Sequence, residues 1–335
     1  FTLADLGTFN RSGGTVNLKG ILDNSGTTLL LDAVTGSWVI DGGRINNGVV
    51  DSADGSTLVV SSNSNNRLSG VTIDADLNLS ASSARLRLSN DVVVNGTITV
   101  SGANAGLVSD TTQTLGGSGT IRFQGSGSER DLYVDGGTTL TIGENLTVAG
   151  GNVLLGALFT VGGNSSIINQ GTIIADQPGQ SLRIDAGGTG SFTNAGLVQV
   201  SGGELTLLDQ WDNNGTLELS SGTVNLGGTF RLDDLGTLDR AGGTVNLKGT
   251  LDNTDTTLRL DATTGSWVLD GGSINNGAIE LVEGSTLVVA SNFANRLSGV
   301  TLNADLTLSA SNAHLRLSNG VTVNGTITVS GSSAG

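Results

Sequence analysis

Three short stretches decide the fold of this chain: residues 203–207 read Gly-Glu-Leu-Thr-Leu, and residues 222–226 and 243–247 both read Gly-Thr-Val-Asn-Leu. In each stretch polar and apolar residues alternate with the two-residue period of a β-strand. One apolar slot holds Leu205, Val224 and Val245, and a second holds Leu207, Leu226 and Leu247. Because the same kind of side chain returns to the same slot about every 20 residues, the stretches predict stacked coils of about 20–21 residues.

The segments around these stretches agree with short strands joined by sharp corners. Gly-Gly pairs recur along the chain, for example at 42–43 and 271–272, and Asn-Gly pairs recur at 47–48 and 276–277. Gly and Asn tolerate positive φ, which sharp corners require. An antiparallel sandwich would show similar turn signals, but it has no reason to repeat side chains at the period of the coils. We therefore predict an all-β fold, a right-handed parallel β-helix (β-solenoid).

A much longer repeat lies above the coil period. Residues 1–106 align without a gap with residues 230–335, and 76 of the 106 positions are identical. Residues 1–229 are therefore one full super-repeat, and 230–335 are the start of the next. We expect one continuous β-solenoid over 1–335, with eleven coils in the super-repeat and sixteen in the chain, and a rod roughly 75–80 Å long. The chain starts inside a repeat, so we expect it to be a fragment of a longer protein.

Composition and charge exclude several classes of function. The formal net charge is -15, and the 15 basic residues are spread thinly, so there is no basic stripe to neutralise phosphates. We therefore expect no binding to nucleic acid and no membrane insertion. Cysteine is absent, which leaves no disulfide framework, no thiol nucleophile and no zinc–thiolate site.

Two features should stabilise the stacking of coils. Asn194 and Asn213, one coil apart, are predicted to lie at a corner and to satisfy backbone groups of the neighbouring coil, at about 1 kcal/mol for each hydrogen bond. Phe192 and Trp211 share the same spacing and are predicted to stack in one slot.

The recurring pattern is Asn-x-Gly-Thr-Leu, a short strand, Gly-Gly-Thr and another short strand, as in residues 213–217 and 242–247. In this pattern the chain resembles bacterial large exoproteins, namely filamentous haemagglutinin-like adhesins and the passenger regions of autotransporters. The resemblance covers nearly the whole chain and is compositional and periodic. It implies secretion to the cell surface, a right-handed β-helix and a role in adhesion, biofilm or surface architecture. It transfers no functional residue.

Few residues suggest chemistry. His314 is the only histidine and replaces Arg85 of the first copy, so we expect an outward strand residue rather than a catalytic base. Residues 129–135, with Glu129, Asp131, Tyr133 and Asp135, form the densest charged cluster of the unduplicated middle, and we interpret them as a solvated loop. We predict no catalytic, cofactor-binding or metal-binding residue, except for a weak calcium site for which the candidates are Asp51, Asp54, Asp212, Asp233 and Asp252.

Together these observations predict a structural or adhesive extracellular repeat protein, a rod or fibre segment of a giant bacterial surface protein, without enzymatic activity. The expected partners are copies of itself end to end, neighbouring repeats of the parent chain, and surface glycans or host and cell surfaces. Two alternatives remain, a polysaccharide-degrading β-helix enzyme and a phage or virion fibre. The strand edges at both ends of the rod are expected to invite end-to-end pairing.

Overall fold

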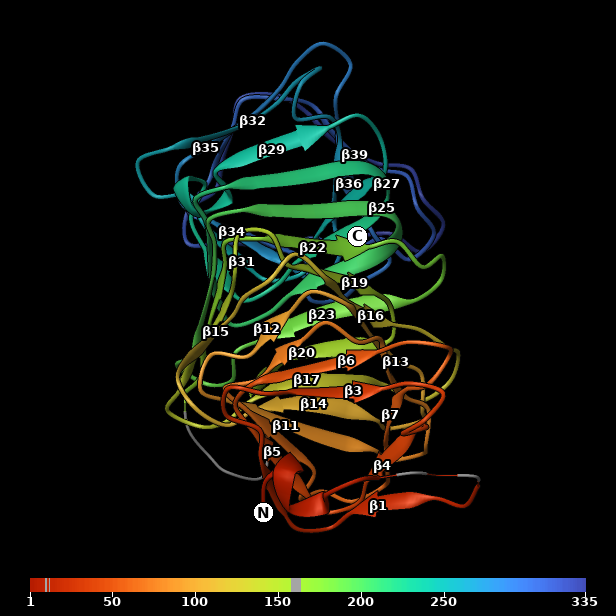
Figure 1. Ribbon diagram of the computed structural model, residues 1–335. Helices are drawn as coiled ribbons and strands as arrows, with labels where there is room; N and C mark the ends of the chain where they lie inside the picture. Colours follow the sequence, from red (N-terminus) through yellow and green to blue (C-terminus); the bar gives the residue numbers. More distant parts are fainter. Residues whose placement is uncertain (10, 12, 158–163) are drawn as a thin grey trace.

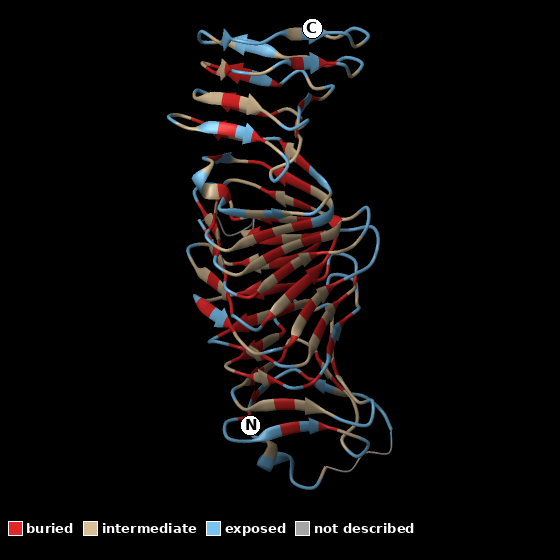
Figure 2. Ribbon diagram, turned by 90° about the horizontal axis from the view of Figure 1, so that it is seen from above, coloured by how far each residue is buried: buried red, intermediate tan, exposed pale blue. Residues whose placement is uncertain are grey.

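The computed structural model describes residues 1–9, 11, 13–157 and 164–335, and these form a β-solenoid of about 14 turns (Figure 1). The named strands pair in parallel, and within the described ranges helix is limited to two short 3-10 segments, η1 (Leu3–Leu6) and η2 (Asp233–Leu235). The turns are stacked into an elongated body with the two termini at opposite ends (Figure 2). The predicted all-β parallel solenoid is therefore confirmed. At 4.7–4.9 Å for each turn the rod is about 65–70 Å long, shorter than the expected 75–80 Å.

Each turn contributes strands to three faces. Face A begins with a ladder of strands that are paired in consecutive turns. It contains β1 (Val16–Leu18), β4 (Trp38–Ile40), β7 (Leu58–Val60), β10 (Leu77–Leu79), β13 (Thr97–Val100), β16 (Thr120–Phe123), β19 (Thr147–Gly150), β22 (Thr172–Ala175), the first halves of β25 (Leu197–Leu207) and β27 (Thr216–Leu226), and β29 (Thr237–Arg240).

Face B follows face A in each turn, and the long strands β25 and β27 run over both faces. It contains β2 (Ile21–Asp23), β5 (Arg44–Asn46), β8 (Arg67–Ser69), β11 (Arg85–Ser89), β14 (Gly106–Ser109), β17 (Arg130–Val134), β20 (Val153–Ala157), β23 (Ser181–Asp185), the second halves of β25 and β27, β30 (Thr244–Leu247), β33 (Trp267–Leu269), β36 (Leu287–Val289), β39 (Leu306–Leu308) and β42 (Ile327–Val329).

Face C completes each turn, and a bridge between Val93 and Gly116 joins its first strands to the later ones. It contains β3 (Thr28–Leu31), β6 (Val49–Ser52), β9 (Thr72–Ile73), β12 (Val93–Val94), β15 (Gln113–Leu115), β18 (Thr139–Ile142), β21 (Ser166–Asn169), β24 (Ser191–Asn194), β26 (Gln210–Asn213), β28 (Thr229–Phe230), β31 (Thr250–Asp252), β34 (Ser273–Asn275), β37 (Arg296–Ser298) and β40 (Arg316–Ser318).

The core is one continuous stack of apolar side chains inside the turns. The slots predicted from the sequence are confirmed, because Leu205 pairs with Val224, Val224 pairs with Val245, and all three are buried. Along most strands buried and more exposed residues alternate, which Figure 2 shows as changes of colour. Burying each Val, Leu or Ile side chain stabilises the stack by about 1.5–3 kcal/mol, so the apolar slots are the main source of stability.

Turn length varies more than the sequence predicts. In the regular part of the chain Leu205 pairs with Val224. In the unduplicated middle, by contrast, Phe123 pairs with Gly150 and Leu155 pairs with Ile184, so these turns are considerably longer. In the first of these turns, residues 124–129 form a long connection between β16 and β17. The predicted counts of eleven and sixteen coils are therefore wrong, since they assume turns of uniform length.

Corresponding strands of the two copies of the super-repeat lie on different faces of the solenoid. From β1, ten successive pairings along face A lead to β29, and β30, the counterpart of β1, then follows on face B. Likewise β31, the counterpart of β2 of face B, pairs with β28 of face C. Only β32 (Thr257–Leu260) separates β31 from β33 of face B, so β32 and its partners β35 (Ala278–Leu281), β38 (Thr301–Leu302) and β41 (Thr322–Val323) continue face A. The super-repeat thus spans ten turns and a third.

The corners use the residues that the sequence indicates. Asn47 and Gly48 have φ values of 61° and 63°, and Asn276 and Gly277 have 62° and 63°. A Cβ atom added to Gly48 would collide with the backbone oxygen of Asn24, so this corner accepts only glycine.

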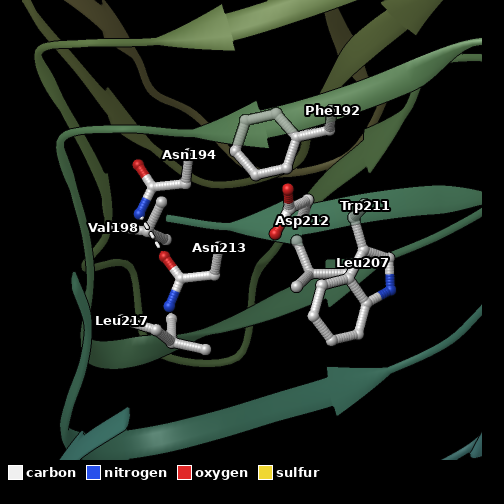
Figure 3. A pocket seen from close by; sticks show the side chains of 8 residues that line it. All are labelled: Phe192, Asn194, Val198, Leu207, Trp211, Asp212, Asn213 and Leu217. Carbon is white, nitrogen blue, oxygen red and sulfur yellow. Dashed lines mark hydrogen bonds between the residues drawn. The ribbon is translucent and has the colours of Figure 1, made fainter. Parts of the chain in front are cut away.

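Buried asparagines join three turns at one corner of face C. Asn169 donates to Asn194 Oδ1 (2.7 Å), Asn194 donates to Asn213 Oδ1 (2.6 Å), and Asn213 donates to the backbone oxygen of Leu235 (2.8 Å); Figure 3 shows the second bond. Asn194 and Asn213 also donate to backbone oxygens of the next turn, as predicted. Phe192 and Trp211 pair in one slot, also as predicted. Buried amides that are hydrogen-bonded from one turn to the next fix the register of the turns.

Candidate functional site

The outward positions of face B from β5 to β23 form the densest group of charged side chains in the described residues. We call this group the charged strip; its members are Arg44, Arg67, Arg85, Arg87, Asp110, Glu129, Asp131, Tyr133, Arg183 and Asp185. These residues come from six different turns, and the parallel register brings them together. In a chain of net charge -15, the N-terminal half of this strip is locally basic.

Three arginines occupy one outward slot at the N-terminal end of the strip. Arg44 pairs in register with Arg67, and Arg67 pairs with Arg87. The Asp110 side chain, 6% exposed, forms ion pairs with both Arg67 and Arg87 at 2.5 Å, and it accepts a hydrogen bond from Arg87 Nε (3.0 Å). Like charges directly opposite each other destabilise a sheet, and Asp110 offsets that repulsion for two of the three arginines.

The next group combines Arg85, Asp131 and Tyr133. Arg85 donates to Asp131 Oδ2 (2.7 Å) and lies over the Tyr133 ring, 5.3 Å from its centre. Gly106 lies between Arg85 and Asp131 on the strand that separates them. Any larger residue would collide there, because an added Cβ atom would lie 2.6 Å from the Asp131 backbone oxygen. Burial raises the pKa of the Asp131 carboxyl, although the Arg85 guanidinium favours the ionised form. Burial and the neighbouring Asp131 carboxylate raise the pKa of Tyr133 to about 12.

The C-terminal part of the strip contains mainly carboxylates. Arg183 donates to Glu129 (3.0 Å), and the backbone N–H of Gly187 donates to both Asp185 Oδ1 (3.1 Å) and Asp209 Oδ2 (3.0 Å). The hydrogen bond to Asp185 raises the pKa of the Asp209 carboxyl, and burial adds to the shift.

The interpretation of residues 129–135 as a solvated loop is wrong for most of them. Residues 130–134 form strand β17, in which Arg130 is 1% exposed and Asp131 5%. Arg130 points inward and donates to the backbone oxygens of Ser101, Gly125 and Ser128. The sequence shows the cluster of charges, but not the partners Arg85 and Arg183, which come from other turns.

The lone histidine lies far along the chain from this strip. His314 is half-buried and stacks on Phe293, with the ring centres 4.2 Å apart. Phe293 is 65% exposed. The first copy has Ser64 and Arg85 at these two positions, so this aromatic pair belongs to the second copy alone.

The calcium candidates are distributed over separate corners. Asp51 accepts from the N–H of its neighbour Ser52 (2.7 Å), and Asp54 accepts from the N–H of Ala33 (3.4 Å). Asp54 lies with Asp76 beside a shallow hollow next to β6 and β7.

The other three candidates do not stack on one another. Phe230 packs on Trp211, so Arg231 takes the slot that follows Asp212, and Arg231 donates to Asp252 (2.8 Å). Asp233 lies in η2, outside that slot. The three carboxylates therefore form no column, because Arg231 lies between Asp212 and Asp252. Among the described residues no group of three or more His, Cys, Asp or Glu side chains is close enough to hold a metal ion.

No helix among the described residues has the length and apolar character needed to span a membrane. Comparison with family models, with curated proteins and with solved structures gives no match for this chain. The geometry of the rod and of the charged strip is therefore the basis for a functional proposal.

Proposed function

We propose that this chain is a rod segment of a repetitive extracellular protein, one that acts at a bacterial cell surface through structure and adhesion rather than catalysis. The observation that supports this most is the stack of about 14 turns, in which a long unit of sequence returns with 76 of 106 positions identical. A rod built from near-identical units provides length, and its outward side chains provide repeated contacts.

The partners that we propose follow from the repetitive rod. Neighbouring repeats or copies of the chain pair at the ends of the rod, and surface glycans bind along its sides. The net charge of -15 opposes nucleic acid and anionic membranes as partners.

Negative-stain electron microscopy of the purified chain at low and high concentration tests this proposal. We expect separate rods about 65–70 Å long at low concentration. Long filaments of constant width at high concentration would show end-to-end assembly. Compact particles at both concentrations would overturn the proposal, and a trimer would favour a phage or virion fibre.

A polysaccharide-degrading enzyme is the second candidate, and the group of Arg85, Asp131 and Tyr133 favours it, because carboxylates with raised pKa values are typical of catalytic acids. Incubation with acidic polysaccharides separates the two functions. We expect no new reducing ends and no unsaturated products, and the appearance of either would replace the structural function with an enzymatic one.

A further inference from the structure

We propose that Arg44 and its neighbours on face B bind a sugar acid, that is, a carboxylate-bearing sugar of a surface glycan. The inference rests on the proposed adhesive function and names the chemical class of its ligand. The residues concerned are Ile21 and Asp23 on β2, Arg44 and Asn46 on β5, and Arg67 on β8, and we call them the Arg44 site.

Arg44 is the one arginine of its stack that has no neutralising carboxylate. Arg67 and Arg87 share Asp110, but in the described part of the chain Arg44 forms no ion pair. Its guanidinium makes a single long hydrogen bond, from Nη2 to Ser69 Oγ at 3.4 Å, and its buried Nε has no partner. An uncompensated third charge next to Arg67 destabilises the sheet, and an anionic ligand would remove that cost.

A carboxylate is the anion that this geometry favours. The planar guanidinium offers parallel N–H donors that match the two oxygens of a carboxylate. Arg67, one turn further on, adds positive charge on the same slot, while its own ion pair with Asp110 keeps it in place.

The other half of the site accepts hydrogen bonds. Asn46 lies two residues from Arg44 on the same side of β5, and its Oδ1 is buried without a partner. Asp23 pairs in register with Asn46, and its carboxylate is oriented by Ser25. Hydrogen bonds from Ser25 lower the pKa of Asp23, so it is ionised at neutral pH. Sugar hydroxyls are donors for both groups.

Ile21 completes the site with an apolar surface. It pairs in register with Arg44 and is 54% exposed, although it lies in a strand. Sugar rings present C–H groups that pack on such a surface. A ligand that combines a carboxylate, hydroxyl donors and C–H groups is a sugar acid.

The same arrangement disfavours a dense polyanion. Asp23 lies at one edge of the site, and the whole chain has a net charge of -15. Duplex DNA carries one charge for about each 1.7 Å of its axis, so it would meet this repulsion along its whole length. A sugar acid on an otherwise neutral glycan brings a single charge to the arginine.

The second copy of the super-repeat supplies a natural comparison. Its counterparts of Arg67 and Arg87 are Arg296 and Arg316, but Ser273 stands where the first copy has Arg44, and Thr250 stands where it has Ile21. The fold thus accepts serine in this slot, and Arg44→Ser is a substitution that the solenoid itself already contains.

Titration of the full chain with methyl glucuronide and with methyl glucoside, followed by ligand-observed NMR, tests the site. We expect saturable binding of the glucuronide, and binding of the uncharged glucoside at least about tenfold weaker, since the glucoside lacks the carboxylate that forms charge-assisted hydrogen bonds with Arg44. Equal binding of the two sugars, or no binding of the glucuronide, would overturn the proposal.

Two variants localise the effect. Arg44→Ser should weaken glucuronide binding at least about tenfold, whereas Arg259→Ser removes one positive charge from face A and should leave it unchanged. If Arg44→Ser alters the unfolding curve, Arg44→Lys retains the charge without the planar fork and should show a partial loss. Unchanged binding in Arg44→Ser would place the ligand elsewhere and contradict the proposal.

Electron microscopy of the same samples separates this inference from the proposed function. Rods that do not bind the glucuronide would refute the Arg44 site and leave the rod function intact. Compact particles would refute the rod function, whatever the result of the titration.

Discussion

At the scale of single residues, the charged strip shows how stacking gives a side chain partners that are distant in sequence. Arg85 and Asp131 are 46 positions apart, yet their side chains are 2.7 Å apart because β11, β14 and β17 follow one another on face B. Gly106 between them leaves room for the pair. Two turns are thus bridged by one ion pair.

Tyr133 provides a direct measurement of this environment, because it is the only tyrosine of the chain. Its pKa is raised to about 12, so absorbance titration should show phenolate only near that pH rather than near 10. Asp131→Asn removes a negative charge beside the phenol, which stabilises the phenolate and should lower the midpoint. A midpoint near 10 in the unaltered protein would show that Tyr133 is solvated and unperturbed.

The partners of these charged residues could not be predicted from the sequence. The cluster at 129–135 is visible as charge, and Asp110 and Arg87 are visible as separate charges, but nothing local says that they meet. The turns of the middle differ in length from the regular ones, so a period taken from residues 203–247 does not give the register there. Side-chain contacts between residues of different turns can be assigned only when the pairing register of the strands is known.

At the scale of elements, the apolar slots and the corner asparagines were predictable because each depends on a local pattern. Leu205, Val224 and Val245 repeat within the regular part of the chain, and their pairing follows directly. Asn194 and Asn213 were predicted to bond to backbone groups, and they do. Their bond to each other and the third member, Asn169, were not predicted, because the turn from Asn169 to Asn194 is longer than the turn from Asn194 to Asn213.

The asparagine ladder should contribute strongly to stability. Asn194→Ala leaves one N–H of Asn169 Nδ2 without its acceptor, while the other still donates to the Leu197 backbone oxygen. It also leaves Asn213 Oδ1 without its donor and removes a buried side chain, so we expect a loss of about 2–5 kcal/mol in the free energy of unfolding. Asn214→Ala is the control, since that side chain is exposed and bonds only to Asp212; we expect a change within about 0.5 kcal/mol. Urea unfolding followed by circular dichroism measures both, and similar losses in the two variants would contradict the ladder's role.

At the scale of the whole molecule, the super-repeat is not a whole number of turns long. The additional third of a turn changes which face of the rod presents a given residue to a partner. A strand that lies on one face in the first copy has its counterpart on the adjacent face in the second copy; β1 lies on face A and its counterpart β30 on face B. Identical outward residues are therefore distributed around the rod rather than along one side. A partner that recognises them would approach successive copies from different directions.

This arrangement can be tested by cross-linking, because the chain contains no cysteine. Thr244 of β30 pairs with Thr223 on face B, whereas Thr216, on face A, pairs with Thr237 of β29. Adjacent parallel strands are about 4.7–4.9 Å apart, within the Cα separation that a disulfide accepts. The double variant Thr223→Cys/Thr244→Cys should therefore form a disulfide on mild oxidation, and Thr216→Cys/Thr244→Cys should not, as measured by mass spectrometry of tryptic peptides. The opposite result would mean that β30 lies on face A above β27, that the super-repeat contains a whole number of turns, and that its copies present the same residues on one side of the rod.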